Sequence, residues 1–144
     1  MRSRLDAPES WLAIHGFLVA FLWEMFQMPF FDASDLSTWQ VTANCGLASF
    51  GDAGIMVTAY VIASWCMGDR HWLSKPSSRS VLVYLATGQA ITIGIEIVAV
   101  RVSWGWSYSN LMPMALGVGL VPVVMWVLVP LLSLGLAMRS IRRE

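Results

Sequence analysis

Four long apolar segments, separated by shorter polar connections, dominate the chain. They cover about residues 11–31, 43–67, 81–100 and 111–138. Each is long enough to cross the hydrocarbon core of a bilayer as a helix, which takes about 20 apolar residues. Strand-type alternation of apolar and polar positions is absent from these segments. The pattern therefore predicts an all-α polytopic membrane protein, with one bundle of four transmembrane helices as its single domain.

The amino-acid composition excludes other classes of protein. Charged residues make up 12% of the 144 residues, and hydrophobic residues make up 57%. A soluble domain carries about 25% charged residues, so this chain has too few polar groups to coat a soluble globule. The formal net charge is zero, which leaves no basic field to attract nucleic acid. The partner that the composition predicts is the lipid bilayer.

The basic residues predict the orientation of the bundle, because Lys and Arg concentrate on the cytoplasmic side of membrane proteins. Of the nine Lys and Arg residues, Arg101 alone lies in a connection that the topology places outside. The others flank the chain ends or the connection between the second and third segments: Arg2, Arg4, Arg70, Lys75, Arg79, Arg139, Arg142 and Arg143. Both termini are therefore predicted to be cytoplasmic.

Three carboxylic acids lie inside the apolar segments: Glu24, Asp52 and Glu96. A charged group at the bilayer centre costs about 2.5–3.5 kcal/mol, so three of them need a physical reason. At 1.5 Å of rise per residue, all three lie about 8 to 13 Å below the outer edge. Desolvation disfavours the ionised carboxylate, which suits general acid chemistry. We predict that these residues form a catalytic site; the alternative is a purely structural hydrogen-bond network between helices.

Polar neighbours share a helix face with two of these acids. Gln27 lies about one turn from Glu24, and Gln89, Thr92 and Glu96 recur at helical spacing. Such spacings place side chains on one side of a helix. Lipid would reject these polar faces, so they are expected to look towards a common interior.

The connection before the fourth segment adds hydrogen-bond donors and aromatic rings. Together with Gln27, four of its residues are predicted to bind the ligand: Arg101, Trp106, Tyr108 and Asn110. Arg101 is also a candidate ion-pair partner for Glu96, five residues before it. Because this connection lies on the same side as the three acids, it is expected to complete a polar pocket in the outer half of the bilayer.

Capping residues and prolines shape the expected fourth helix. Ser109 or Asn110 is the candidate N-cap, with Pro113 in the first turn. Pro122 lacks a backbone N–H and follows the residues Gly117 and Gly119, so it is expected to kink the helix.

The sequence contains only weak patterns of metal-binding residues. Cys45 and Cys66 are separated by about 30 Å along one helix, which excludes a disulfide between them. Neither a metal site nor a particular cofactor is predicted. Thioethers and a thiol on the outer side form a candidate Cu(I) set, although methionine more often fills gaps in apolar cores. The members of that set are Met25, Met28, Met112, Met114 and Cys45.

Several motifs together resemble a group of small bacterial four-span integral membrane proteins of uncharacterised activity. The resemblance covers nearly the whole chain and implies a bacterial inner (cytoplasmic) membrane location. The motifs are Trp23-Glu24-Met25-Phe26-Gln27-Met28-Pro29, Cys45-Gly46, Gly51-Asp52, Glu96, Trp106-Ser107-Tyr108-Ser109, Met112-Pro113 and Gly119-Leu120-Val121-Pro122.

A looser likeness is carried by Glu96, Trp106, Tyr108 and Pro113. These residues are similar to an acidic residue, an aromatic pair and a downstream proline in the membrane carotenoid cyclases and hydratases. That likeness implies an acid that protonates an isoprenoid double bond and aromatic rings that stabilise the cation.

The predicted function is to bind or transform a small amphipathic or lipid-soluble molecule by acid/base chemistry. Two alternatives stay open from the sequence. The chain could be a non-catalytic binding or assembly subunit of a larger membrane complex. It could also be a proton-coupled carrier, which at 144 residues would need to act as a homo-oligomer.

Overall fold

The computed structural model describes residues 7–142. All four long helices are long and apolar enough to span a membrane, which confirms the predicted all-α membrane fold. Two short 3-10 helices and a two-stranded hairpin complete the fold. In chain order the elements are α1 (Pro8–Gln27), η2 (Met28–Phe30), α2 (Thr38–Met67), η3 (Trp72–Ser74), α3 (Ser78–Ala99), β1 (Met114–Ala115), β2 (Val118–Gly119) and α4 (Leu120–Ile141).

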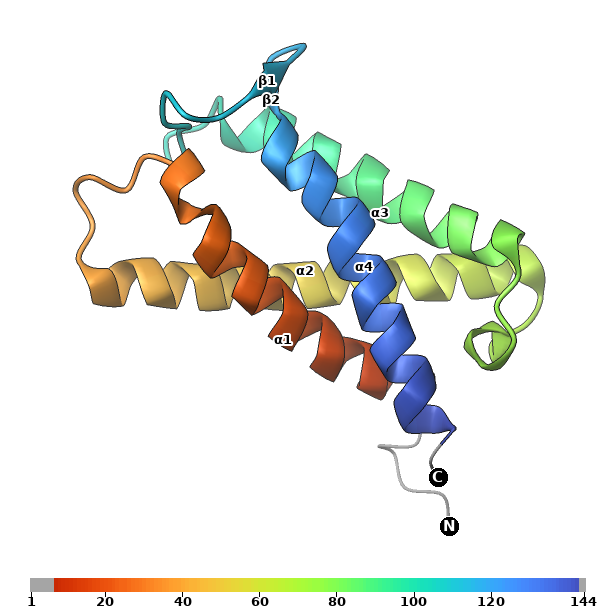
Figure 1. The fold of residues 1–144 in the computed structure, drawn as a ribbon. Helices are drawn as coiled ribbons and strands as arrows, with labels where there is room; N and C mark the ends of the chain where they lie inside the picture. The colour runs from red at the N-terminus through yellow and green to blue at the C-terminus, as the bar shows by residue number, and fades with distance from the viewer. Residues whose placement is uncertain (1–6, 143–144) are drawn as a thin grey trace.

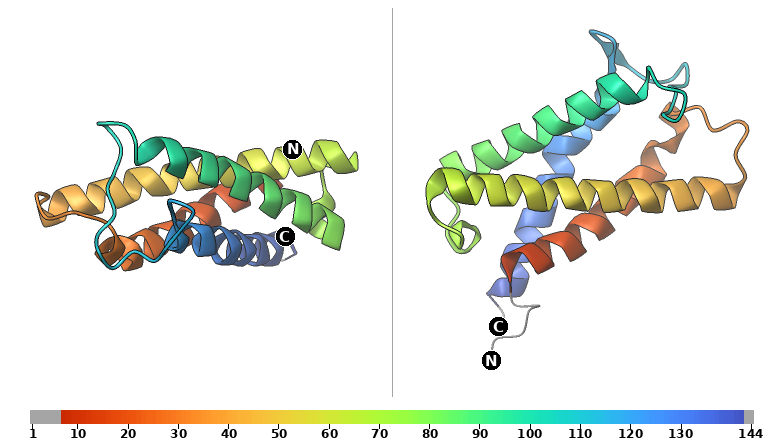
Figure 2. Two further views of the ribbon diagram at one scale, coloured as in Figure 1. Left: turned by 90° about the horizontal axis from the view of Figure 1, so that it is seen from above. Right: turned by 180° about the vertical axis from the view of Figure 1, so that it is seen from behind.

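Each long helix packs on two others, so that the order around the bundle is α1, α2, α3, α4. The helices are splayed: α2 and α3 meet at the loop of residues 68–77 and diverge towards their other ends (Figures 1 and 2). The start of α1 lies beside the end of α4, where His15 Nε2 and Ser140 Oγ are 2.9 Å apart. The bundle therefore has one closed end and one wider end, at which α1 stops and α4 begins.

The basic residues mark the two ends differently. The loop between α2 and α3 packs against α4 through η3. This loop, the first turn of α3 and the end of α4 together carry Arg70, Lys75, Arg79, Arg139 and Arg142. Arg101 lies at the opposite end, after α3. Arg2, Arg4 and Arg143 lie outside the described residues, and the assignment of the basic end to the cytoplasm stays a prediction.

Capping motifs set where α2 and α3 begin. The Ser37 hydroxyl accepts a hydrogen bond from the Gln40 N–H, and the Gln40 side chain accepts one from the Ser37 N–H. Ser77 and Ser80 form the same reciprocal arrangement before α3. Each box satisfies backbone groups that a helix end leaves without partners. Both helices therefore start several residues before the apolar segments predicted to begin at residues 43 and 81.

The fourth helix begins at Leu120, well after the predicted start at residue 111. The preceding residues form a hairpin in which β1 pairs with β2. Its turn places Leu116 at φ 53° and Gly117 at φ 80°, the left-handed region that tight hairpin turns need and that glycine adopts without strain. The Leu120 N–H donates to the Pro113 carbonyl across 2.8 Å, which closes this hairpin against the helix start.

Two expectations for the fourth helix are wrong as a consequence. Its N-cap is Gly119, and neither Ser109 nor Asn110 caps it. Pro122 lies in the first turn, where a helix has no intrahelical partner for an N–H. The predicted kink at Pro122 is therefore absent, and the proline inside the helix is Pro130.

Trp126 fixes the contact between α3 and α4. Its side chain is 2% exposed and lies against Gly88, where a Cβ atom would come within 2.5 Å of the indole ring. Gly94, on the same helix, has nothing within 4 Å of that position. The close approach of α3 and α4 therefore requires a residue without a side chain at position 88.

We predict that Gly88→Ala destabilises the protein by about 1–3 kcal/mol, because overpacking forces neighbouring groups to move. The matched variant Gly94→Ala should leave stability unchanged or raise it, since alanine favours helix more than glycine does. Thermal unfolding of both variants in detergent checks this. Equal melting temperatures for the two would contradict the proposed packing.

Candidate functional site

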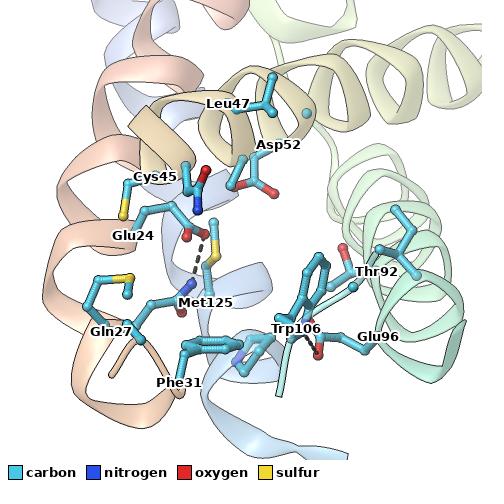
Figure 3. Close-up of a pocket in the computed structure, with 18 of the residues that line it drawn as sticks. Glu24, Gln27, Phe31, Cys45, Leu47, Asp52, Thr92, Glu96, Trp106 and Met125 are labelled. Atoms are coloured by element: carbon cyan, nitrogen blue, oxygen red, sulfur yellow. Dashed lines mark hydrogen bonds between the residues drawn. The ribbon is translucent and has the colours of Figure 1, made fainter. Parts of the chain in front are cut away.

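A cavity of about 490 Å³ lies between the helices at the wide end of the bundle (Figure 3). Its volume falls in the range of about 300–1,000 Å³ that is typical of small-molecule sites. All four long helices and both connections at this end contribute to its wall. The polar and aromatic lining residues include Glu24, Gln27, Phe31, Asp52, Thr92, Glu96, Trp104, Trp106 and Trp126.

On α1, hydrogen bonds orient the first carboxyl group. The Gln27 side-chain amide donates to Glu24 Oε1 at 2.8 Å. The side-chain oxygen of Gln27, Oε1, in turn accepts a hydrogen bond from the Trp23 indole N–H at 2.8 Å. Gln27 lies about one helical turn from both Trp23 and Glu24, so its side chain can reach each of them. This chain of bonds holds the Glu24 carboxyl group at the cavity wall.

On α3, the Glu96 carboxyl group is bound by two donors from the connection that follows the helix. Its Oε2 atom accepts from the Tyr108 hydroxyl and from the Trp106 indole N–H at 3.3 Å. The Tyr108 oxygen itself accepts from the Gly119 N–H at 3.2 Å. A line of hydrogen bonds thus runs from the start of α4 to the acid on α3.

Tyr108 is held as a hydrogen-bond donor at neutral pH. Burial raises the pKa of Tyr108 to about 12, and the hydrogen bond to Glu96 acts in the same direction. The phenol is therefore un-ionised throughout the physiological range. It presents its proton to Glu96 and leaves its oxygen for the Gly119 N–H.

The connection after α3 is fastened to the segment that follows α1. Phe31 and Tyr108 form an isolated antiparallel bridge, and the Asp32 N–H donates to the Ser107 carbonyl at 3.0 Å. The Ser109 hydroxyl donates to the Pro29 carbonyl at 2.8 Å. These bonds hold the connection across the wide end, where Trp106 and Phe31 lie over the cavity (Figure 3).

Two polar atoms in the cavity wall have no hydrogen-bond partner within residues 7–142. They are Asp52 Oδ2 on α2 and Thr92 Oγ1 on α3, and both are fully buried. Helical hydroxyl groups elsewhere donate to the carbonyl one turn earlier, as Ser49 does to Cys45 and Thr58 does to Gly54. Thr92 differs from these residues, so its hydroxyl is available to another group.

The structure brings most of the predicted site residues to this cavity. Glu24, Asp52 and Glu96 line it together with Gln27 and Trp106. The three acids come from three different helices, α1, α2 and α3. Each also lies within electrostatic range of at least one of the others.

The remaining predicted residues occupy other positions. Tyr108 reaches the site through its bond to Glu96, while Asn110 is exposed in the connection. Arg101 donates to the Ile97 carbonyl in the last turn of α3, just before it. Within residues 7–142 the only ion pair joins Arg70 and Glu9, so the expected pairing of Arg101 with Glu96 is wrong. Five residues of separation do not place two side chains on one helix face.

Several lining residues were not assigned to the site from the sequence. Thr92 was expected on the inward face of α3, one turn before Glu96, but was given no role in the site. Trp126 was notable only as an indole deep inside an apolar segment. Phe31 and Trp104 carried no local signal, because their position depends on how the two connections pair.

The candidate copper ligands are not gathered at the cavity as a set. Met28 and Cys45 line it, but the Met112 sulfur lies against Gly119 and Met114 is exposed on β1. Across residues 7–142, no group of three or more His, Cys, Asp and Glu side chains is arranged to hold a metal ion.

The fold and the cavity define a class: an integral membrane protein of four helices with carboxyl groups around an internal hollow. Neither protein-family models nor curated proteins nor solved structures give a match to this chain.

We predict that Tyr108→Phe lowers stability by about 1–3 kcal/mol, because it leaves the buried Glu96 oxygen and the Gly119 N–H each short of a partner. Tyr84→Phe is the matched control, since the Tyr84 hydroxyl is buried without a partner and its loss breaks no bond. Thermal unfolding at pH 7 compares the two. Equal effects would contradict the hydrogen-bonded line from α4 to Glu96.

A second prediction concerns alkaline pH. The pKa of Tyr108 is about 12 in the folded protein, against an ordinary value of 10.0. A raised acid pKa gives stability that is fully present below pH 10 and is lost as the pH rises through 12. The wild type should therefore lose more stability than Tyr108→Phe between pH 10 and pH 12. Parallel pH profiles for the two proteins would show that Tyr108 is not held in this environment.

Proposed function

We propose that this membrane protein binds or transforms a small amphipathic or lipid-soluble molecule by acid/base chemistry in the cavity. One observation carries the proposal: carboxyl groups from α1, α2 and α3 line a single hollow. A carboxyl group inside a membrane protein is costly, and such groups usually mark a functional site. We further propose that the host membrane is the inner membrane of a bacterium.

The rim of the cavity favours a ligand that arrives from the bilayer. Leu47 on α2 and Trp104 after α3 both line the cavity and are 73% and 76% exposed. Ile95 on α3 lines it too and is also exposed. Leu47 and Ile95 belong to α2 and α3, which diverge from each other away from their connecting loop (Figure 2). A lipid-soluble molecule can therefore pass between these two helices without crossing a polar surface.

The two oriented acids support a role in proton transfer. Gln27 positions the carboxyl group of Glu24, and Tyr108 and Trp106 position that of Glu96. A catalytic acid or base needs such a fixed position relative to the group that it protonates or deprotonates. Four residues carry the resemblance to the carotenoid cyclases and hydratases. Three of them, Glu96, Trp106 and Tyr108, are joined by hydrogen bonds, whereas Pro113 does not line the cavity.

We predict that a lipid-soluble compound copurifies with the wild-type protein and that Glu24→Gln and Glu96→Gln each deplete it. Losing a hydrogen bond to a charged group costs about 1.5–3 kcal/mol, which corresponds to roughly a tenfold to hundredfold loss of affinity. Mass spectrometry of organic extracts from the purified proteins measures this depletion, and the yield in the membrane reports on insertion.

Asp35→Asn provides the matched control, because Asp35 is an exposed acid that does not line the cavity. It should retain the compound at the wild-type level. The proposal fails if the extracts of wild type, Glu24→Gln, Glu96→Gln and Asp35→Asn have the same content. That result would favour a structural subunit of a larger membrane complex.

A further inference from the structure

The acidic and basic side chains of the cavity wall can carry charge of one sign only. Its ionisable lining residues are acids, with Asp32 at the outer edge in addition to the three acids of the helices. No Lys, Arg or His side chain is among the lining residues within residues 7–142. Arg101, the basic residue nearest in sequence, is bonded to the Ile97 carbonyl instead. An anionic group in this cavity would meet only like charge, whereas a cationic group would meet its complement.

The unpartnered oxygens point to a ligand that donates hydrogen bonds. Thr92 is 6% exposed, lines the cavity and has no partner for Oγ1. Asp52 on α2 also lines the cavity, and its Oδ2 atom is buried without a hydrogen-bond partner among residues 7–142. Buried polar atoms in native proteins are nearly always hydrogen-bonded. A polar group bound between α2 and α3 with several N–H donors would satisfy both oxygens.

Aromatic rings form a further part of the wall. Phe31, Trp106 and Trp126 line the cavity, and the rings of Phe31 and Trp106 are in edge contact with centroids 6.5 Å apart. The face of an aromatic ring attracts a cation, and desolvation strengthens this attraction. Trp106 also donates to Glu96, so one indole lies next to both the acid and the hollow (Figure 3).

From these three observations we infer that the ligand is a lipophilic amine, with its nitrogen between Asp52, Thr92 and Glu96 and its apolar body in the mouth beside Leu47 and Trp104. The inference rests on the proposed function, namely that the cavity takes an amphipathic molecule. The amine arrives from the lipid as the neutral base. The O–H bond of a carboxyl group breaks, an N–H bond forms, and the ammonium group stays paired with the carboxylate. No net charge crosses the hydrocarbon in this step.

Three probes with the same twelve-carbon tail test the inference: dodecylamine, dodecanol and dodecanoate. The full chain is placed in nanodiscs of phosphatidylcholine, which carries no net charge, and empty nanodiscs give the background. Radiolabelled dodecylamine should bind saturably. Unlabelled dodecanol should compete at least about tenfold more weakly than unlabelled dodecylamine, and dodecanoate should not compete.

Variants locate the bound amine. Asp52→Asn should weaken dodecylamine binding at least tenfold, and Thr92→Val should weaken it severalfold while keeping the shape of the side chain. Thr58→Val is the matched control, because Thr58 is exposed on α2 and bonds to its own helix. It should bind like the wild type. Melting temperatures show whether each variant is folded before its affinity is compared.

The outcomes separate this inference from the proposed function. Dodecanol that binds saturably and as tightly as dodecylamine, with both weakened by Glu96→Gln, overturns the amine inference and leaves the proposed function standing. The inference also fails if Asp52→Asn and Thr92→Val bind dodecylamine as the wild type does. Absence of saturable binding by all three probes contradicts the inference and the proposed function together.

Discussion

A carboxyl group cannot face hydrocarbon without a large cost, and this constraint governs the arrangement of the bundle. Glu24, Asp52 and Glu96 lie on three separate helices that are otherwise strongly apolar. Exposing each acid at the bilayer centre would cost about 2.5–3.5 kcal/mol. The rotation of each helix about its axis that turns its acid inwards is therefore strongly favoured. The same rotation creates a polar hollow inside a protein whose outer surface suits lipid.

The connection between α3 and α4 supplies the side chains that bind the Glu96 carboxyl group. It must pass very close to the end of α3, since a Cβ atom at Gly105 would lie within 1.8 Å of the Ala99 carbonyl oxygen. Only glycine permits that path. The path brings the Trp106 and Tyr108 side chains onto Glu96. Bonds to the segment after α1 then hold the connection across the wide end. The acid on α3 is thus positioned by residues that follow it rather than by its own helix.

The sequence predicted the parts of the fold that depend on apolar length and helical period. The apolar segments identified all four helices, and the cost of burying charge singled out the acids that now share a cavity. The start of α4 could not be predicted in this way, because Leu111, Met112, Met114 and Leu116 continue the apolar pattern through the hairpin. Pairing of β1 with β2 is a tertiary outcome that outweighs the apolarity of these residues.

Residues outside the helices were harder to place for a related reason. Trp106 and Tyr108 stood out by type, but their bonds to Glu96 depend on the course of the connection. Arg101 was assigned to the site by charge alone, whereas its side chain donates to the Ile97 carbonyl near the end of α3. Phe31 and Trp104 line the cavity through long-range pairing of two connections, which no local pattern records.

Carboxyl modification by dicyclohexylcarbodiimide, a lipid-soluble reagent, tests the shared cavity most directly. Peptide mass spectrometry measures the modification at Glu24, Asp52 and Glu96 in the wild type and in two variants. Ala48→Trp places a bulky side chain in the cavity wall, and Ala86→Trp places one on the exposed face of α3, outside the lining. The account predicts that all three acids are modified, that Ala48→Trp suppresses all three together, and that Ala86→Trp suppresses none. Modification of one acid alone, or suppression that differs among the three, would contradict a common cavity.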